Sequence, residues 1–341
     1  MTEETKYPLV TFALVSYNQE KHIREAVEAA LAQDYPNLEI ILSDDCSKDG
    51  TFEIIKDLAS AYAGAHQVVV RQSPTNRGLG RHFQDVVQVA KGDFLVAAAG
   101  DDISLPSRTR LMVDLMRREG AQLGASNFNR MNNSGELLTE NERNDYSSNY
   151  LWEIVDADPS RFVNGATAVY KRSFLLRAFS ASLDAIRAGK LYNEDIFLSA
   201  FAIAEGRKPA SYCVAGLVNY RVNPDSLSNF VRESGDFKSQ MQLIRRQQFW
   251  SMTRIGILDV VEEIAMNYPE FSQLVRWRVI ARNRRLAEFE LMASHAQFLQ
   301  RLQAIKFIQN AADVRVWLVR LFGERMHGLV RVLSAMLANR T

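Results

Sequence analysis

The chain has 341 residues, of which 47% are hydrophobic, enough for one large domain with a full core and an appendage. Its formal net charge of +1 gives no overall field that would attract nucleic acid. Its two cysteines, Cys46 and Cys213, exclude a disulfide framework and suit a reducing compartment.

The N-terminus, Met1-Thr2-Glu3-Glu4, lacks the apolar region of a secretory signal, and no apolar stretch approaches the length needed to cross a bilayer. We therefore expect a cytoplasmic protein, with peripheral contact at the inner face of the membrane as an option. Charge is divided unevenly along the chain. Residues 271–341 hold twelve Lys/Arg and four acids, a balance of +8 against −7 for the remainder, which indicates a basic C-terminal appendage.

The first hundred residues alternate between two hydrophobic patterns. Continuous apolar runs predict strands, and stripes at a spacing of three and four predict helices. The predicted strands are Leu9–Ser16, Leu38–Ser43, Val68–Val70 and Phe94–Ala99, and the predicted helices are Glu20–Ala32, Thr51–Tyr62, Leu79–Ala90 and one that starts near Pro106. This alternation predicts an α/β fold: a mostly parallel, Rossmann-like sheet flanked by helices on both faces.

Later segments are less regular. Asn129–Tyr150 reads as a loop or as a hairpin around Asn133-Ser134-Gly135, and Asn223–Gln240 as another loop. After Met241 the pattern is helical to the end of the chain.

Three pairs of acids fall at strand ends or loop starts, namely Asp44-Asp45, Asp101-Asp102 and Glu194-Asp195. Ligands of open α/β sheets bind beyond the carboxyl ends of the strands, where carboxylates suit hydroxyl and amide donors or a hard divalent cation. Helix capping accounts for Ser47 to Asp49 but leaves Asp44 and Asp45 unexplained. A simple turn remains the alternative for Asp101-Asp102.

The segment Asn76-Arg77-Gly78-Leu79-Gly80-Arg81 is similar to a phosphate-facing loop at a helix N-terminus. It is neither a dinucleotide fingerprint nor a P-loop. The five histidines show no metal-ligand spacing, and we expect them at the surface or at edges.

Five segments together resemble the inverting family-two glycosyltransferases with the GT-A fold, over roughly residues 8 to 225. Their order and spacing carry the resemblance. They are Thr11–Glu20, Ser43–Thr51, Asn76–Leu79, Ala99–Asp102 and Asn193–Asp195.

The resemblance implies roles for residues. Those implied to line the donor-nucleotide pocket are Ser16, Tyr17, Asn18, Glu20, Asp44, Asp45, Asn76, Arg77 and Asp101. Asp101 would also hold Mn²⁺ or Mg²⁺ against the diphosphate, and Asp195 would deprotonate the acceptor hydroxyl. Residues implied on the acceptor or donor side are Asp102, Asn164, Gly165, Glu194, Arg221 and Asn223. For Asn164-Gly165 a plain β-turn is an equal alternative.

The implied activity is transfer of a sugar from a UDP- or dTDP-sugar to a hydroxyl of a glycan or lipid-linked glycan, in bacterial surface polysaccharide or glycan biosynthesis. The GT-A domain would span 1–225, with a nucleotide-binding half of 1–105 and an acceptor half of 106–225, and 226–341 would be a helical region. No nucleic acid partner is expected.

Two departures from the family pattern leave other readings open. Ala99 replaces the first acid of the D-x-D motif, and Asn223 stands where a histidine is common. One alternative is therefore a catalytically impaired nucleotide-sugar-binding or scaffolding protein that acts through its basic helices. A sugar nucleotidyltransferase is disfavoured, because Tyr17–Glu20 replaces the Gly-rich basic loop it would need.

The C-terminal region predicts basic amphipathic helices. Apolar side chains recur at helical spacing over residues 314–322 and 329–337, with arginines between them. Such a helix can rest on an anionic membrane, but it can equally pack on the catalytic domain or form a homo-oligomer.

Overall fold

A computed structural model describes residues 7–142, 163–181, 194–204 and 210–222, and a few single positions beyond residue 254. The chain divides into two compact units, Met1–Val231 with Met252–Ala287 and Arg232–Ser251 with Glu288–Thr341. The fold described below belongs to the first unit. The segment 223–240 and the basic helices of 314–337 lie outside the described residues, so these predictions and the boundary at residue 225 stay predictions.

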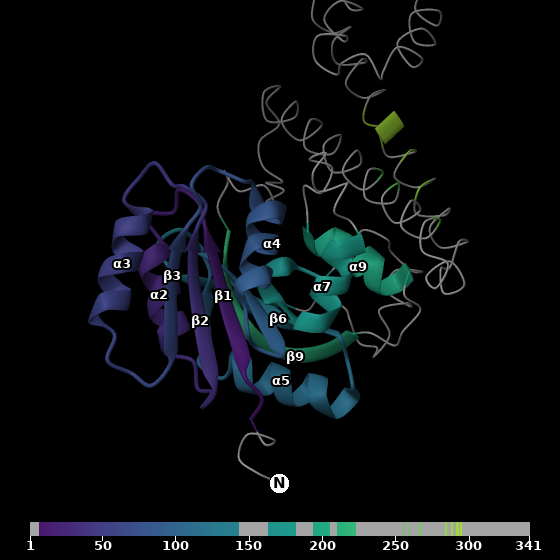
Figure 1. Cartoon of the computed structure of the whole chain (residues 1–341), viewed down its shortest axis with the longest axis horizontal. Coiled ribbons are helices and arrows are strands. Elements are labelled where there is room, and N and C mark those ends of the chain that lie inside the picture. Colours follow the sequence, from purple (N-terminus) through teal and green to yellow (C-terminus); the bar gives the residue numbers. More distant parts are fainter. Residues whose placement is uncertain are drawn as a thin grey trace, which may run out of the picture. The chain divides into compact units, whose positions relative to one another are not determined.

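The N-terminal half is built as predicted from alternating strands and helices (Figure 1). Its elements are β1 (Val10–Ser16), α2 (Ile23–Leu31), β2 (Leu38–Asp44), α3 (Thr51–Ala61), β3 (Gln67–Gln72), α4 (Leu79–Val89) and β4 (Phe94–Ala99). All of β2 and nearly all of β1 are buried, because helices cover both faces of the sheet at these strands.

The described strands form a nine-stranded mixed sheet in the order β3-β2-β1-β4-β8-β6-β9-β5, with β7 paired to β6. Strands β3, β2, β1 and β4 are parallel. Ser16 is paired with Asp44, and Val15 with Ala99. The carboxyl ends of β1, β2 and β4 therefore lie level at one edge of the sheet.

The second half of the sheet departs from the parallel pattern. Here β8 runs antiparallel to both β4 and β6, and β9 runs parallel to β6. The elements are β5 (Ile103–Ser104), α5 (Arg108–Glu119), β6 (Leu123–Met131), β7 (Leu137–Glu142), a 3₁₀ turn η1 (Gly165–Thr167), β8 (Ala168–Lys171), α7 (Arg172–Ala181), α9 (Glu194–Ala204) and β9 (Ala210–Arg221).

Two local predictions in this half are confirmed. Helix α5 follows Pro106 and ends at Gly120, whose φ of 66° is the left-handed conformation that suits a helix end. Of the two readings left open for the next segment, a loop or a hairpin, the structure shows the hairpin, with β6 and β7 paired around residues 133–135. Its turn is closed by Asn132 Oδ1, which accepts hydrogen bonds from the backbone of Ser134 and Glu136.

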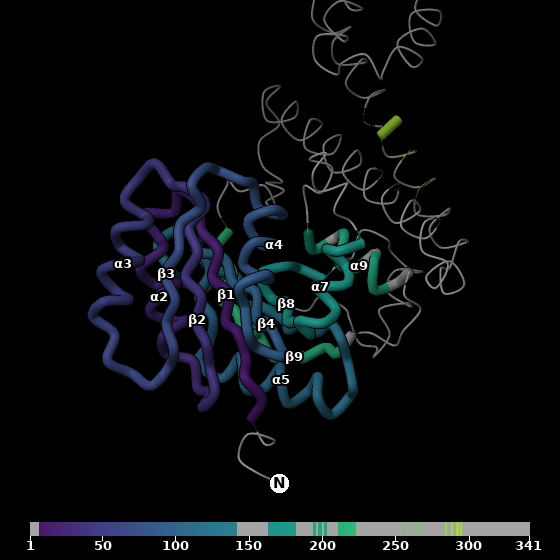
Figure 2. The backbone as a smooth tube through the Cα atoms, in the orientation of Figure 1, coloured from purple at the N-terminus to yellow at the C-terminus, as the bar shows by residue number. Residues whose placement is uncertain are grey.

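Two groups of helices pack on the sheet, α2 with α3 and α4 with α7 and α9 (Figure 2). Helix α5 belongs to neither group and packs against β6 and β9. Aromatic side chains join the second group, with ring contacts among Phe83, Tyr170, Phe174, Phe179, Phe197 and Phe201. The rings of this cluster come from α4, β8, α7 and α9, so the cluster holds the first turns of α9 against the other three elements.

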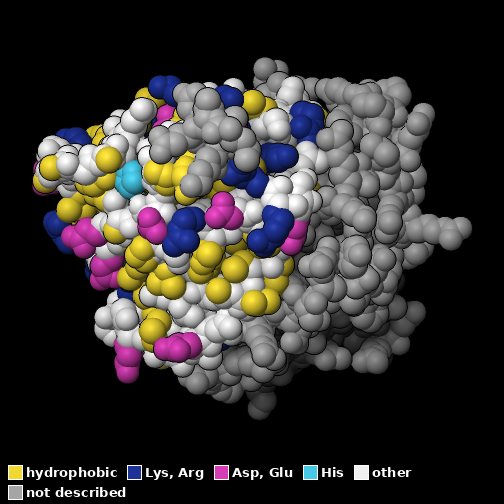
Figure 3. Space-filling model, turned by 90° about the horizontal axis from the view of Figure 1, so that it is seen from below, with side chains coloured by type: hydrophobic (Ala, Val, Ile, Leu, Met, Phe, Trp, Pro, Cys, Tyr) yellow, Lys and Arg dark blue, Asp and Glu magenta, His cyan; other side chains and the backbone are white. Residues whose placement is uncertain are grey.

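The described surface carries no block of one charge in the view of Figure 3, where acidic and basic side chains alternate among hydrophobic ones. Within the described residues, no helix is both long enough and apolar enough to pass through a bilayer.

Candidate active site at the carboxyl ends of the strands

Two loops that follow β1 and β2 are joined by hydrogen bonds. Asn18 is central, because its backbone N–H donates to Ser47 Oγ at 2.8 Å and its Oδ1 accepts from Lys48 N at 2.9 Å. Asn18 has a φ of 51° and Cys46 a φ of 62°, so both loops turn sharply here. Two further bonds close the pair, from Gln19 N to Thr51 Oγ1 and from Glu20 N to Asp49 Oδ2.

This pairing holds the segment Ser16–Glu20 against the segment Asp44–Thr51, as both were expected to line one pocket. Tyr17 stands 40% exposed on the first loop, so its ring is accessible to a ligand.

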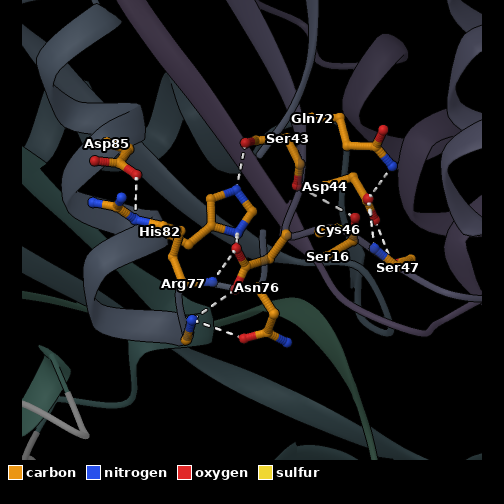
Figure 4. A network of polar contacts seen from close by, with 12 residues as sticks. Ser16, Ser43, Asp44, Cys46, Ser47, Gln72, Asn76, Arg77, His82 and Asp85 are labelled. Atoms are coloured by element: carbon orange, nitrogen blue, oxygen red, sulfur yellow. Dashed lines mark hydrogen bonds and ion pairs between the residues drawn. The ribbon is translucent and has the colours of Figure 1, made fainter. Parts of the chain in front are cut away.

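Asp44 is enclosed by its own turn. It is fully buried, and its carboxylate accepts hydrogen bonds from Ser47 N at 2.9 Å, from Ser47 Oγ and from Gln72 Nε2 at 2.9 Å (Figure 4). The structure therefore gives Asp44 a supporting role, in which it shapes the turn that carries Asp45. These three donors compensate the burial of Asp44, which helix capping had left unexplained, and its contact with a nucleotide stays a prediction.

Asp45 holds the loop before α4. Its Oδ1 accepts from Arg77 N at 2.9 Å and its Oδ2 from Gly78 N at 2.8 Å. Asn76 Oδ1 also accepts from Gly78 N at 3.0 Å, and Gly78 has a φ of 76° that glycine adopts readily. The Asn76-Arg77-Gly78 motif is thus brought to Asp45 from a distant part of the chain.

His82 lies beneath Asp45 and corrects the expectation that the histidines lie at the surface or at edges. It is only 2% exposed, although it belongs to α4. Its Nε2 lies 2.5 Å from Ser43 Oγ, and its Nδ1 lies 3.6 Å from Asp45 Oδ1. Burial lowers the pKa of His82, so its ring is neutral at neutral pH.

Gly100 allows the loop after β4 to approach the loop after β1. A Cβ atom at this position would lie 2.3 Å from Gln19 Oε1 and 2.9 Å from Ser16 Cβ. The backbone closes the approach with a hydrogen bond from Gly100 N to Val15 O. Asp101, the next residue, therefore lies beside the loop that follows β1.

Arg221, the last residue of β9, supports the backbone of Asp101 and Asp102. Its side chain is 1% exposed, and its Nε donates to Asp101 O at 2.9 Å. Its Nη1 donates to the carbonyls of Asn132 and Asn133, and its Nη2 to Glu25 Oε2 at 2.6 Å. The side chain expected to face a substrate is therefore committed to holding the β4–β5 loop.

Asp102 completes this contact from the other side. Its Oδ1 accepts from Arg221 N at 2.8 Å, and the residue is 6% exposed. Burial raises the pKa of Asp102 well above its usual range, and the neighbouring Asp101 raises it further. Asp102 thus acts as part of the loop's support.

Asp101 has the character of a carboxylate that a cation would stabilise. Burial raises its pKa, while hydrogen bonding and the nearby His22 and Arg221 oppose the rise. Within the described residues, no group of three or more His, Cys, Asp or Glu side chains is arranged to hold a metal ion. Mg²⁺ and Mn²⁺ are often bound by one or two carboxylates together with phosphate oxygens, so a single acid fits such an ion when a diphosphate supplies the other ligands.

Asp195 and Glu194 form a separate acidic pair in the first turn of α9. Asp195 Oδ2 accepts a hydrogen bond from Gly165 N at 3.2 Å. Asn164 Oδ1 accepts from Ala166 N, so Asn164 caps η1 and presents Gly165 to the acid. Asn164-Gly165 is thus a 3₁₀ turn tied to Asp195.

Glu194 is the other acid of this pair. Its Oε2 is buried and has no hydrogen-bond partner. Burial raises its pKa to about 8, and the charge of Asp195 adds to the rise. Tyr170 is close enough that both acids raise its pKa, although burial is the larger cause.

A family model matches the N-terminal half of the chain. The model described as "Glycosyl transferase family 2" covers residues 11–179, from β1 to α7. The chain belongs to glycosyl transferase family 2.

Two relatives resemble parts of the chain. EpsE of Bacillus subtilis (strain 168), named as a glycosyltransferase, is 34% identical over 111 residues, 33% of this chain and 39% of EpsE. The succinoglycan biosynthesis protein ExoO of Rhizobium meliloti (strain 1021) is 27% identical over 239 residues, 67% of this chain and 64% of ExoO. The chain thus spans less than two thirds of the length of these relatives.

A solved structure shares the fold. The mannosyltransferase PcManGT from Pyrobaculum calidifontis, in complex with GDP-Man and Mn²⁺, superposes with a TM-score of 0.55 at 17% identity, over 97% of this chain and 84% of that chain. The fold expected from the family resemblance, GT-A, is confirmed.

Reasoning from the sequence of this family 2 member missed several residues that shape the site. His22 at the start of α2, Glu25 in its first turn and His82 all act through contacts between distant segments. Arg221 was singled out, but as a residue that faces a substrate and not as a support of the β4–β5 loop. Arg108 was missed as well. It is fully buried beneath the site and donates to Ser104 Oγ, Ala97 O and Ala168 O, so it ties β4 to β8. Asn223 lies outside the described residues.

Proposed function

We propose that the chain is an inverting glycosyltransferase that moves a sugar from a nucleoside diphosphate-sugar to a hydroxyl of a glycan or lipid-linked glycan. The observation that carries the proposal is the arrangement of acids around one sheet edge: Asp45 with its loops, and Asp101 on the β4–β5 loop, with Asp195 held by the η1 turn. The relatives EpsE and ExoO favour a role in polysaccharide biosynthesis.

The donor nucleotide would lie over the loops after β1 and β2. Tyr17 offers an exposed ring for stacking. The carboxylate of Asp45 has the capacity to accept a further hydrogen bond, since its two oxygens accept about four hydrogen bonds in all. Two backbone N–H groups already hold it in place. A base with a ring N–H, as in UDP, dTDP or GDP, is the chemistry that Asp45 would recognise.

The diphosphate would lie near Asp101. Asp101 would hold Mn²⁺ or Mg²⁺ together with phosphate oxygens, and PcManGT, which contains GDP-Man and Mn²⁺, supports this assignment. Such an ion offsets the charge that develops on the leaving diphosphate. Arg221 keeps Asp101 in position through the backbone contact described above.

Asp195 would act as the general base. It would take the proton of the acceptor hydroxyl while the oxygen bonds to the anomeric carbon of the sugar. The bond from that carbon to the diphosphate oxygen breaks in the same displacement, and the nucleoside diphosphate leaves. Inversion at the anomeric carbon follows from a single displacement.

The test of this function is Asp195→Asn in the full chain. Asparagine keeps the shape of the side chain but cannot accept the proton, so we expect turnover to fall by about 10²- to 10⁴-fold while nucleotide binding stays unchanged. Turnover is measured as release of nucleoside diphosphate from a panel of nucleotide-sugars, and binding by calorimetry. Asp57→Asn, which alters an exposed acid of α3, is the matched control. Turnover of Asp195→Asn equal to that of the control would refute the role of Asp195. A wild-type chain that binds nucleotide without turnover would favour the binding-protein alternative.

A further inference from the structure

The position of His82 calls for an explanation that the proposed reaction does not provide. A buried imidazole lies between two strands and a helix, in contact with the acid assigned to the nucleotide base. Charged groups from several elements act on it: Asp45 and Asp44 at the end of β2, Arg71 from β3, and Asp85 from its own helix.

Hydrogen-bonding capacity orders the protons in this group, of which Figure 4 shows Ser43 and His82. Ser43 and Arg71 are register partners in β2 and β3, and Arg71 Nη1 donates to Ser43 Oγ at 3.3 Å. The hydroxyl of Ser43 can then donate a hydrogen bond to His82 Nε2, which lies 2.5 Å away. With Nε2 as an acceptor, a neutral imidazole carries its proton on Nδ1, which faces Asp45 Oδ1 at 3.6 Å. Burial, the largest influence, lowers the pKa of His82 and so favours this neutral form.

A chain of donors and acceptors therefore runs from Nη1 of Arg71 through Ser43 and His82 to the carboxylate of Asp45. We propose that His82 is a positioning residue of the nucleotide subsite, which fixes the orientation of the Asp45 carboxylate through this Arg71–Ser43–His82–Asp45 relay. The proposal rests on the function proposed above, in which Asp45 binds the base.

The relay explains how Asp45 can be both buried and oriented. The N–H groups of Arg77 and Gly78 come from a loop and contact one oxygen each. His82 approaches Oδ1 from α4, a different direction, and so restricts rotation of the carboxylate. An acid fixed in this way keeps its remaining acceptor position aimed at one place.

Substitutions at His82 test the contacts of its two ring nitrogens separately. The amide of asparagine occupies the place of Nδ1 and can still donate to Asp45, whereas the amide of glutamine reaches only the place of Nε2. Leucine removes both contacts. Val86→Ala, which removes packing from the same helix without touching the relay, is the matched control for a general loosening of α4.

Binding of UDP, dTDP and GDP is measured by calorimetry, and kcat and KM from nucleotide-sugar turnover, each beside a melting curve. We expect His82→Leu and His82→Gln to weaken the tightest of these nucleotides about tenfold and to raise the donor KM equally, with kcat unchanged, since one polar contact that orients the Asp45 carboxylate is at stake. His82→Asn should recover most of the affinity. Val86→Ala should melt earlier but bind as the wild type does.

Three results would overturn the relay. The first is that Asp45→Asn weakens nucleotide binding while His82→Leu leaves it intact. The second is that Val86→Ala weakens binding as much as His82→Leu does. The third is a nitrogen NMR spectrum of the wild-type chain in which His82 is protonated at Nε2. A wild-type chain that binds none of the three nucleotides would refute the proposed function and, with it, the role of the relay in nucleotide binding. The NMR spectrum would then still show whether the proton of His82 lies on Nδ1.

Discussion

Arg221 offers the sharpest test of how the site is held together. We consider Arg221→Lys, which keeps the charge but replaces a planar fork by a single ammonium group. The guanidinium donates to Asp101 O, Asn132 O, Asn133 O and Glu25 Oε2, which lie on different sides of it. A lysine cannot reach all four, so at least two of these hydrogen bonds are lost.

The size of the effect follows from burial. Arg221 is 1% exposed, so carbonyl groups that lose their donor are left without water, and each lost bond from a charged donor costs about 1.5 kcal/mol or more. Glu25 is 47% exposed, so its ion pair adds little. The expected loss is about 3 kcal/mol, which corresponds to a fall of roughly 6–12 °C in melting temperature for a domain of this size.

The assay is thermal unfolding of the full chain, monitored by differential scanning calorimetry. Arg110→Lys is the matched control, because Arg110 is exposed and pairs with the exposed Asp34 at 3.0 Å, a contact worth about 0–1 kcal/mol. If Arg221→Lys melts no earlier than Arg110→Lys, the buried contacts of Arg221 do not support the β4–β5 loop and the reasoning fails.

Two further predictions concern the acids. Asp101→Ala should abolish the strengthening of nucleotide binding by Mn²⁺ while metal-free binding persists; calorimetry with and without the ion measures this, and an unchanged metal effect would contradict the assignment. Glu194, whose pKa is raised from 4.5 to about 8 in the folded chain, binds a proton there that the unfolded chain releases. Stability should therefore fall as pH rises from about 4.5 to 8, by roughly a few kcal/mol at most. Glu194→Gln should flatten this slope and melt later than the wild type at pH 8.5; parallel melting curves of the two chains across that range would count against a buried Glu194.

The sequence alone predicted the elements that position the site. The apolar run from Leu9 to Ser16 and the stripes of α2, α3 and α4 follow from burial on both faces of a sheet, which imposes a period that can be read directly. The acids Asp45, Asp101 and Asp195 could also be picked out, because charges beside apolar runs need a partner or a ligand. Parallel pairing of β1, β2 and β4 then places the first two of them at one edge.

Other features needed the tertiary structure. The antiparallel β8, between β4 and β6, has only four residues, too few for a period to reveal, and its neighbours lie far away in the chain. The burial of Asp44 and His82 and the support given by Arg221 depend on partners many residues apart, and a local pattern cannot name those partners. Sequence periodicity reports which face of an element is covered; which polar group meets which across the core is decided only when the strands are in register and the helices have packed.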